Sequence, residues 1–257
     1  MSDVLLRAEN ISKRFTLAGR DDFWAVREVN FELRAGEALG LVGESGSGKS
    51  TLGRLLLGLH DKSEGCAYFR DKPLPQAYRR ADFRHYSSQM QMVFQDPYAT
   101  LNPRFTIGSS IAEPLLLRGE RDHLSKRVAQ ALERVGLSAA MANRYPHEFS
   151  GGQRQRIGIA RALIVEPTLL ICDEPVSALD VSVQAQIINL LGQLRREMNL
   201  SLIFISHDLA VVRHLCERIA VMQGGRIVEL EDRQTLFAQP QHEFTKKLLA
   251  ARFNSLL

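Results

Sequence analysis

Residues 38–50 read Ala-Leu-Gly-Leu-Val-Gly-Glu-Ser-Gly-Ser-Gly-Lys-Ser, and this stretch decides the fold. Its second part, from Gly43 to Ser50, matches the phosphate-loop pattern G-x-x-x-x-G-K-[ST] at every fixed position. Its first part, Ala38–Val42, predicts a buried strand, and the leucines of Ser50–Leu59 fall on one helical face. A strand, this loop and a helix in that order predict a nucleoside-triphosphate site in an α/β chain.

The residues of the phosphate loop each have an expected role. Glycines permit backbone conformations closed to other residues, so that successive N–H groups point inward at the phosphates. We expect Lys49 to reach the β- and γ-phosphates and the Ser50 hydroxyl to ligate Mg²⁺. The flanking strand and helix disfavour the alternative, a glycine- and serine-rich turn without a ligand. The expected nucleotide contacts from this loop are Gly43, Glu44, Ser45, Gly46, Ser47, Gly48, Lys49, Ser50 and Thr51.

A second apolar run, Leu169–Cys172, ends in two carboxylates, Asp173 and Glu174. A buried parallel strand delivers such residues to its carboxyl end, where α/β proteins bind their ligands. Asp173 suits the Mg²⁺ shell, and Glu174 suits a general base that orients the attacking water. The alternative is an Asp-Glu pair that caps a helix, which the phosphate loop upstream disfavours.

Strand and helix patterns alternate along the rest of the chain. Apolar runs between turn residues predict strands at Val4–Ala8, Val29–Leu33, Glu37–Val42, Cys66–Phe69, Met90–Phe94, Leu169–Cys172 and Leu202–Ile205, with a closing hairpin at 219–228. The segment 97–155 carries helical patterns instead, including the amphipathic stretch Ser125–Val135, and no strand signal. Alternation of strand and helix favours a parallel sheet. We therefore expect an α/β chain with a helical insertion.

Composition limits the class of protein without naming a function. The chain has 257 residues, of which 45% are hydrophobic and 24% charged, with a net charge of +4. These values exclude a collagen-like or disordered chain, and the charge is too small to indicate nucleic acid. The cysteines at 66, 172 and 216 form no C-x-x-C pair, which favours a reducing compartment. No apolar run approaches the roughly 18 residues of a membrane helix, and early charges argue against a signal peptide.

Four further motifs stand in a fixed order around these two sites. The sequence Phe149-Ser-Gly-Gly-Gln153 precedes the helix-like stretch Arg154–Leu163. Here the chain resembles the ATP-binding-cassette (ABC) ATPases, whose signature is LSGGQ. Gln95 in Phe-Gln-Asp-Pro resembles their Q-loop, Ser177–Asp180 their D-loop, and His207 in Ile-Ser-His-Asp their switch histidine. The resemblance covers essentially the whole chain.

The resemblance implies a fold and a division of the chain. The fold class is α/β, a P-loop NTPase core with a mostly parallel sheet, an N-terminal antiparallel β-subdomain and an inserted helical subdomain. A single ABC ATPase domain would span residues 1–257. Its core and β-subdomain would occupy 1–96 and 156–230, its helical subdomain 97–155, and a C-terminal extension 231–257.

The resemblance also implies a site shared between two cassettes, in which each ATP lies between the phosphate loop of one and the signature of the other. The signature contacts would be Ser150, Gly151, Gly152 and Gln153, with Asp180 as a contact across the dimer. The catalytic residues would be Glu174, His207, Gln95 and Lys49. The Mg²⁺ ligands would be Ser50, Gln95 and Asp173.

The resemblance also implies that an aromatic residue just before the first loop of the β-subdomain stacks on adenine. Phe15 occupies the place where most family members have tyrosine, and stacking needs only the ring. Val26 would flank the base as an apolar contact. Phe23 and Trp24 remain rivals to Phe15.

Several stretches resemble the peptide/nickel importer branch of the family. They are 94–104, 145–156 and 179–186, and 241–250 is similar to a C-terminal His-Pro-Tyr-Thr motif of that branch. The last stretch departs from it, with Glu243 and Phe244 in place of Pro-Tyr. Because no cysteine-bearing tail follows, no iron–sulfur cluster is expected.

This branch implies an ATPase subunit that energises a bacterial importer of di- or oligopeptides or antimicrobial peptides, as the F-type member of a pair. Its expected partners are two permease subunits, a sister ATPase or a second copy, and indirectly a periplasmic or extracellular solute-binding protein, with no nucleic acid. It would lie peripherally at the cytoplasmic face of the inner (plasma) membrane. A permease helix would dock near Asp96–Arg104, unless that segment is only a surface loop.

Other functions stay open beside this one. They are a nickel importer ATPase, a non-transport cassette of a carbon–phosphorus lyase-type complex, and a cassette protein of the DNA-repair or ribosome type. The last needs a long coiled-coil insertion or two fused cassettes, and the sequence shows neither. A neighbouring permease gene would separate transport from the lyase-type function.

Overall fold

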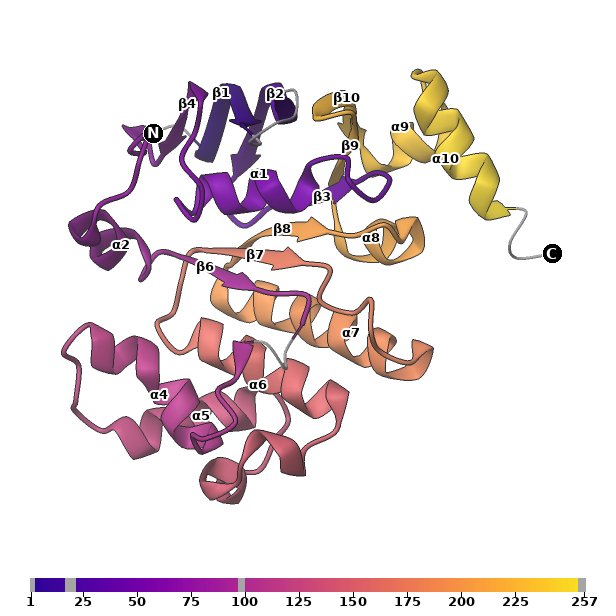
Figure 1. The fold of residues 1–257 in the computed structure, drawn as a ribbon. Helices are drawn as coiled ribbons and strands as arrows, with labels where there is room; N and C mark the ends of the chain where they lie inside the picture. The colour runs from indigo at the N-terminus through magenta and orange to yellow at the C-terminus, as the bar shows by residue number, and fades with distance from the viewer. Residues whose placement is uncertain (1–2, 17–21, 97–99, 254–257) are drawn as a thin grey trace. The chain divides into compact units, whose positions relative to one another are not determined.

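The computed structural model describes residues 3–16, 22–96 and 100–253. The chain divides into two compact units, Met1–Phe83 with Ser201–Leu257, and Arg84–Leu200 (Figure 1). The helices expected within 97–155 belong to the second unit, which also holds two strands and a long helix. Within the described ranges, no helix is both long enough and apolar enough to cross a bilayer.

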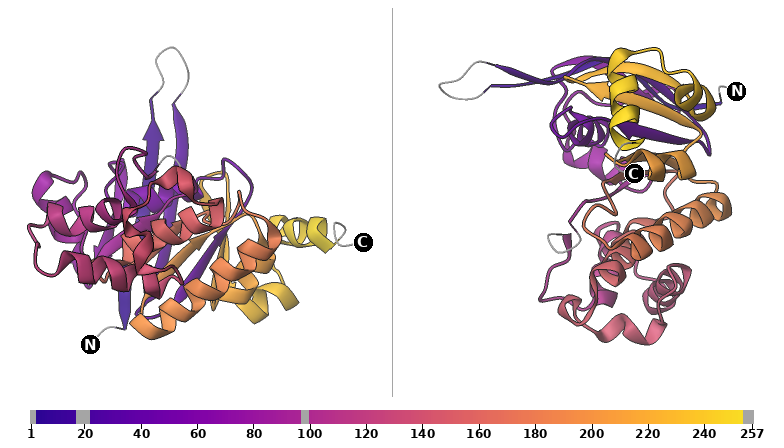
Figure 2. Two further views of the ribbon diagram at one scale, coloured as in Figure 1. Left: turned by 90° about the horizontal axis from the view of Figure 1, so that it is seen from below. Right: turned by 90° about the vertical axis from the view of Figure 1, so that its right-hand side faces the viewer.

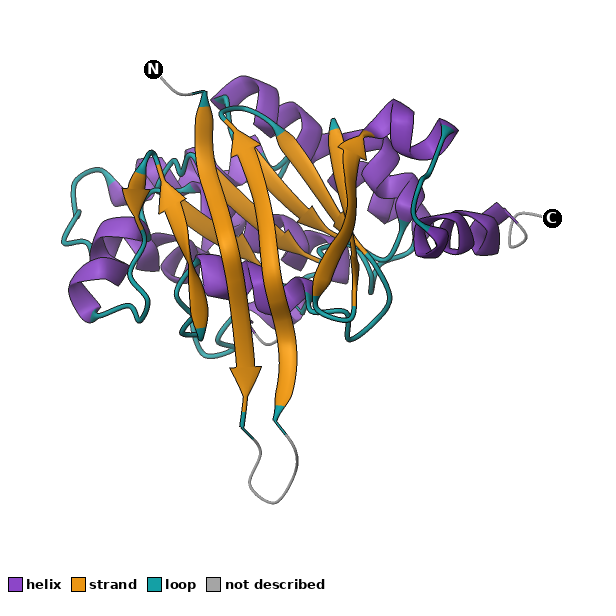
Figure 3. Cartoon of the chain, turned by 90° about the horizontal axis from the view of Figure 1, so that it is seen from above, coloured by secondary structure: helices purple, strands orange, loops and turns teal. Residues whose placement is uncertain are grey.

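The first unit contains an antiparallel sheet with the strand order β2-β1-β4-β5. Its strands are β1 (Val4–Phe15), β2 (Phe23–Arg34), β4 (Glu64–Phe69) and β5 (Lys72–Pro73). β1 and β2 extend as a two-stranded ribbon well past β4 and β5 (Figures 2 and 3). Both strands are longer than the sequence predicted, because the outer ribbon is held by cross-strand pairing and needs no continuous apolar face.

The same unit holds four consecutive strands of a second sheet, in the order β10-β9-β3-β8. They are β3 (Ala38–Val42), β8 (Ser201–Ile205), β9 (Arg218–Gln223) and β10 (Arg226–Asp232). β3 pairs in parallel with β8 and β9, and β10 turns back antiparallel to β9. Every residue of β3 and β8 is buried, as their uninterrupted apolar sequences predict for a parallel sheet.

Helix α1 (Lys49–Leu56) lies between the two sheets of this unit (Figure 1). Its Leu52 and Leu56 line a residual cavity of ≈ 10 Å³ together with Phe31 of β2 and Leu39 of β3. The predicted helix reached Leu59, but the observed one ends earlier. Gly58 has a φ of 71°, and the ring of Tyr78 packs so closely on it that a Cβ would lie 2.1 Å from Tyr78 Cγ. Three more helices of this unit are α8 (Leu209–Leu215), α9 (Arg233–Ala238) and α10 (Glu243–Phe253).

The second unit combines a parallel strand pair with a group of helices. β6 (Met90–Val93) pairs with β7 (Leu169–Asp173). The helices are α4 (Ile107–Leu117), α5 (Leu124–Arg134), η1 (Ala139–Asn143), η2 (Pro146–Glu148), α6 (Gly151–Leu163) and α7 (Val181–Met198), while α2 (Arg80–Tyr86) crosses the boundary of the units. α4, α5 and α6 pack against one another, and α6 also packs against β6. Their contacts bury apolar side chains such as Ile111, Leu132 and Ile157 completely.

Glu229 anchors the start of α10 to the second sheet of the first unit. Its Oε1 accepts the N–H of Gln241 at 2.7 Å, and its Oε2 accepts the N–H of His242 at 3.1 Å. Burial raises the pKa of Glu229, but the hydrogen bonds led by that from Gln241 outweigh it and hold the pKa below its ordinary value. The C-terminal motif at 241–250 is therefore tied to β10 through one carboxylate.

Replacing this carboxylate is expected to destabilise the protein. Glu229→Gln should lower the free energy of unfolding at pH 7 by about 1–2 kcal/mol, because an amide has only one oxygen acceptor for the two N–H groups. Since the folded pKa is depressed, the carboxylate's contribution is present above the ordinary pKa of 4.5 and fades as the pH falls through the lower folded value. Urea unfolding at pH 7 and at acid pH measures both effects.

The matched control for this test is Glu231→Gln, which changes an exposed carboxylate on the same strand. It should leave the unfolding free energy almost unchanged. Equal losses in the two variants would contradict the anchoring role of Glu229.

Candidate active site

The loop between β3 and α1 has the backbone of a phosphate cradle. Gly43, Gly46 and Gly48 have φ values of 153°, 79° and 100°, in the region that favours glycine. A Cβ on Gly48 would lie 2.1 Å from the backbone oxygen of Ala25, and one on Gly43 would lie 2.2 Å from that of Met222. The loop is therefore pressed between β2 and β9, and any side chain at these two glycines would force it out of place.

Lys49 begins α1 and points back into this loop. Its side chain is buried, and its Nζ donates to the carbonyl oxygens of Gly43 at 2.9 Å and Glu44 at 2.7 Å, and to Ser47 Oγ at 3.3 Å. These oxygens hold the ammonium inside the loop, where phosphate oxygens would compete for its N–H donors. The left-handed glycines and the buried cation together fit a phosphate chain.

The remaining loop residues lie on the solvent side or on the first helical turn. Glu44, Ser45 and Gly46 are exposed, whereas Ser50 and Thr51 are half-buried on α1. The Ser50 hydroxyl therefore belongs to the same helix start as Lys49, as expected of a metal ligand that is placed by a helix.

His207 lies at the same edge of the sheet as the phosphate loop. Leu41 of β3 pairs with Ile205 of β8, and the N–H of Ser206 donates to the carbonyl of Leu41 at 3.1 Å. Gly43 and His207 each follow these paired residues by two positions, at the carboxyl ends of parallel strands. His207 is exposed, so its imidazole is presented at this edge.

Gln95 and Glu174 meet in the second unit, at the carboxyl ends of β6 and β7. Val93 pairs with Cys172, so the segments that follow leave the sheet side by side. Gln95 Nε2 donates to Glu174 Oε2 at 3.2 Å, and Ser177 Oγ donates to the Glu174 carbonyl at 3.1 Å. The expected sensor and the expected general base are thus in direct contact.

The two carboxylates that end β7 differ in their surroundings. Asp173 is buried, while Glu174 is half-buried and has a φ of 47°, a left-handed backbone that costs a non-glycine residue free energy. This backbone turns the chain sharply after the strand and leaves the Glu174 side chain within reach of water. Such a division suits one carboxylate for a metal and the other for a proton.

The signature forms the first turn of α6. Ser150 Oγ accepts the N–H of Gln153 at 3.3 Å, and Gln153 Oε1 accepts the N–H of Ser150 at 3.0 Å, which is a capping box. A Cβ on Gly152 would lie 2.4 Å from Val183 Cγ1 of α7, and Gly151 faces Leu179. The glycines therefore let the start of α6 approach the D-loop, where Asp180 is exposed and its side chain makes no hydrogen bond that caps α7.

The aromatic candidates lie on the outer part of the β1–β2 ribbon. Phe15 pairs with Phe23 across the strands, and the His60 ring meets its edge at a centroid distance of 5.5 Å. Phe23 is 52% exposed, and Trp24 is half-buried beneath the Arg14 guanidinium. The ribbon connects these rings to the phosphate loop through Ala25, which contacts Gly48.

Val26, expected to flank the base, is fully buried. Its side chain lies in the core of the first unit, and on the ribbon it pairs with Lys13, whose Nζ lies 5.0 Å from the centroid of the Phe15 ring. The structure places Val26 inside the ribbon, and its contact with the base stays a prediction.

Sequence reasoning missed several residues that shape these sites. The carbonyl of Ala25 forms a wall of the phosphate loop, and Val183 forms the surface on which Gly152 rests. Neither residue could be recognised from a sequence motif, because each acts only through its position in the fold. Ser177 was assigned to the D-loop, but its hydrogen bonds to Glu174 and from Gln95 depend on geometry that the motif does not state.

A model of the ABC transporter family matches residues 26–177. The oligopeptide transport ATP-binding protein OppF of Salmonella typhimurium is 50% identical over 259 residues, which are 96% of this chain and 77% of that protein. A probable peptide ABC transporter ATP-binding protein of Sinorhizobium fredii is 50% identical over 98% of this chain and 73% of its own length. The glutathione import ATP-binding protein GsiA of Pectobacterium atrosepticum is 49% identical over 97% of this chain, but the match spans only 41% of that protein.

Solved structures of cassettes have the same fold. One is the ATP-binding cassette MJ0796, a dimer bound to ADP and Pi after hydrolysis, with a TM-score of 0.81 and 28% identity over 89% of this chain and 99% of that one. Another is cbiO1 from Clostridium perfringens, with a TM-score of 0.82 and 28% identity over 99% of both chains. These similarities confirm the predicted fold class, and the chain belongs to the ABC transporter family as an ATP-binding, ATP-hydrolysing cassette.

Proposed function

We propose that this chain hydrolyses ATP to energise a bacterial importer of peptides, with oligopeptides as the substrate class. The observation that carries the ATPase role is the contact between Gln95 Nε2 and Glu174 Oε2 at the end of two parallel strands. The substrate class rests on the identity of about half the residues with proteins named for oligopeptide transport. The glutathione-import relative supports short peptides in general.

Bound MgATP would supply the phosphoanhydride bond that is cleaved, with Mg²⁺ offsetting the charge of its phosphates. Lys49 would donate to the β- and γ-phosphates, and Ser50, Gln95 and Asp173 would hold the metal. Glu174 would accept a proton from the attacking water, which Gln95 would orient. His207 would contact the γ-phosphate from the carboxyl end of β8.

The adenine would stack on Phe15, whose ring makes a T-shaped contact with His60 and has the Lys13 ammonium beside it, among the contacts of the described residues. Phe23 and Trp24 are the alternatives on the same ribbon. The contacts expected of the loop from Gly43 to Thr51 complete the nucleotide site.

A second cassette would complete the catalytic site. Ser150 and Asp180 are exposed, and Gly151 and Gly152 keep the start of α6 open to an anion. We therefore assign Ser150, Gly151, Gly152, Gln153 and Asp180 to the nucleotide of a partner cassette. That partner would be a sister ATPase or a second copy of this chain.

The chain would work at the cytoplasmic face of the inner membrane, beneath two permease subunits that receive peptide from a solute-binding protein. The expected docking groove at Asp96–Arg104 includes residues 97–99, which lie outside the described residues. On either side of them, Phe94 is 37% exposed and Phe105 is 48% exposed, and these rings suit an apolar contact with a permease helix.

Removing the proposed general base should separate binding from turnover. Glu174→Gln should retain ATP binding but lower hydrolysis by about a hundredfold or more, because the amide cannot accept the proton. Phosphate release measures hydrolysis, and a fluorescent ATP analogue measures binding. Glu197→Gln, an exposed glutamate of α7, is the control, and wild-type hydrolysis in Glu174→Gln would refute the role.

Removing the loop ammonium should strongly weaken nucleotide binding. Lys49→Ala is expected to weaken ATP affinity by at least about a hundredfold, since a buried charge-assisted contact to phosphate is lost. Lys126→Ala removes an exposed lysine and should bind as the wild type does. Unchanged affinity in Lys49→Ala, measured by calorimetry, would rule out the phosphate-loop assignment.

Blocking the signature should affect only the composite site. Ser150→Arg places a bulky cation at an exposed helix cap, so a single chain should still bind ATP while hydrolysis by the assembled pair is lost. Ser138→Arg alters another exposed cap serine, at the start of η1, and should leave hydrolysis intact. If hydrolysis survives in Ser150→Arg, the signature does not serve a site needed for turnover.

A further inference from the structure

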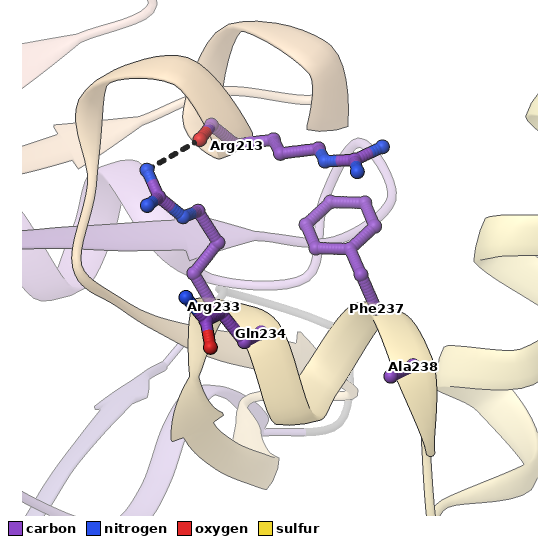
Figure 4. Close-up of a pocket in the computed structure, with 5 residues that line it drawn as sticks. All are labelled: Arg213, Arg233, Gln234, Phe237 and Ala238. Carbon is purple, nitrogen blue, oxygen red and sulfur yellow. Dashed lines mark hydrogen bonds between the residues drawn. The ribbon is translucent and has the colours of Figure 1, made fainter.

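A surface hollow of ≈ 450 Å³ lies between α8 and α9 of the first unit. Arg213, Arg233, Gln234, Phe237 and Ala238 line it (Figure 4). None of these residues is assigned to the nucleotide, the metal or the signature. The ATPase role therefore does not account for this hollow.

One guanidinium of the hollow is held by an aromatic ring. Arg213 Cζ lies 5.0 Å from the centroid of the Phe237 ring, and Figure 4 shows the side chain extended over that ring. Arg213 is exposed, while Phe237 is half-buried on α9. This contact orders the Arg213 side chain before any ligand binds, which lowers the entropy cost of binding.

The other guanidinium is held by a backbone group. Arg233 Nη1 donates to the carbonyl oxygen of Arg213 at 3.0 Å, and Arg233 has further N–H donors. The neighbouring Asp232 is engaged elsewhere, because its Oδ1 accepts the N–H groups of Gln234 and Thr235. Among the described residues, no carboxylate forms an ion pair with Arg213 or Arg233, so both guanidinium groups keep N–H donors for a ligand.

The placement of these charges indicates the shape of a ligand. In Figure 4 the Arg233 guanidinium lies beside the Arg213 carbonyl, whereas the Arg213 guanidinium lies over Phe237, at the other side of the hollow. The two guanidinium groups therefore lie at different sides of the hollow and not side by side. This arrangement suits two carboxylates that are spaced along an extended chain, and the exposed Gln234 also lines the hollow.

We propose that this hollow binds an acidic peptide segment of a partner protein. Two carboxylates of the segment pair with Arg213 and Arg233, and the Phe237 ring packs against an aliphatic stem between them. The surface is open to solvent, as a site for a chain segment requires, and its positive charge selects Asp- and Glu-rich sequences.

The test uses the full chain and two labelled peptides, hexaglutamate and hexaglutamine, followed by fluorescence anisotropy at low salt. Saturable binding of hexaglutamate alone is expected. Arg213→Gln and Arg233→Gln should each weaken it about fivefold or more, and Phe237→Leu about twofold to threefold, because the ordered geometry of Arg213 is lost. Arg121→Gln removes the same charge from an exposed loop and should leave the affinity unchanged.

Hydrolysis of ATP should be the same in all four variants, since none touches the nucleotide residues. Thermal unfolding checks that each variant is folded. Equal weakening by Arg121→Gln would show a diffuse charge effect and overturn the site. Absence of saturable binding to the wild type, or displacement by inorganic tripolyphosphate at lower concentration than by unlabelled hexaglutamate, would also overturn it.

Discussion

The close approach of Gly48 to the carbonyl of Ala25 constrains much of the first unit. Because Gly48 has no side chain, the loop can pass close to the Ala25 carbonyl of β2, and α1 begins directly after it. The position of Lys49 follows, since the ammonium is held by the loop's own oxygens. The burial of α1 between two sheets then fixes the direction of the helix, so that packing far from the loop helps to set the position of Lys49.

Parallel strand pairing sets the positions of the polar residues, as the glycines set the path of the loop backbone. In the first unit, register between β3 and β8 brings the loop and His207 to one edge. In the second unit, register between β6 and β7 brings Gln95 into contact with Glu174. Each pair of residues is far apart in sequence, and in each case the buried apolar strands provide the alignment. The burial of these apolar strands thus sets the positions of the polar residues that follow them.

The sequence predicted those features that are written in local patterns. The phosphate loop and the apolar runs of β3, β7 and β8 were recognised because burial on both faces demands continuous apolar residues. The outer part of β1 and β2 was missed, since Lys13 and Arg14 break any such run. The end of α1 was also missed, because the ring of Tyr78, which packs against Gly58, is distant in sequence. Val26 matched a family position, but its complete burial depends on strand register.

The capping box of α6 has a consequence for selectivity. The first N–H groups of a helix lack partners within it, and here those of Ser150 and Gln153 are already bonded. The donors left at this end belong to Gly151 and Gly152, which carry no side chain to obstruct an incoming group. An incoming anion would therefore find two N–H donors at this helix end, because the N–H groups of Ser150 and Gln153 already have side-chain acceptors. If this end contacts the nucleotide of a partner cassette, as proposed, the phosphate would meet two backbone N–H donors that no side chain covers.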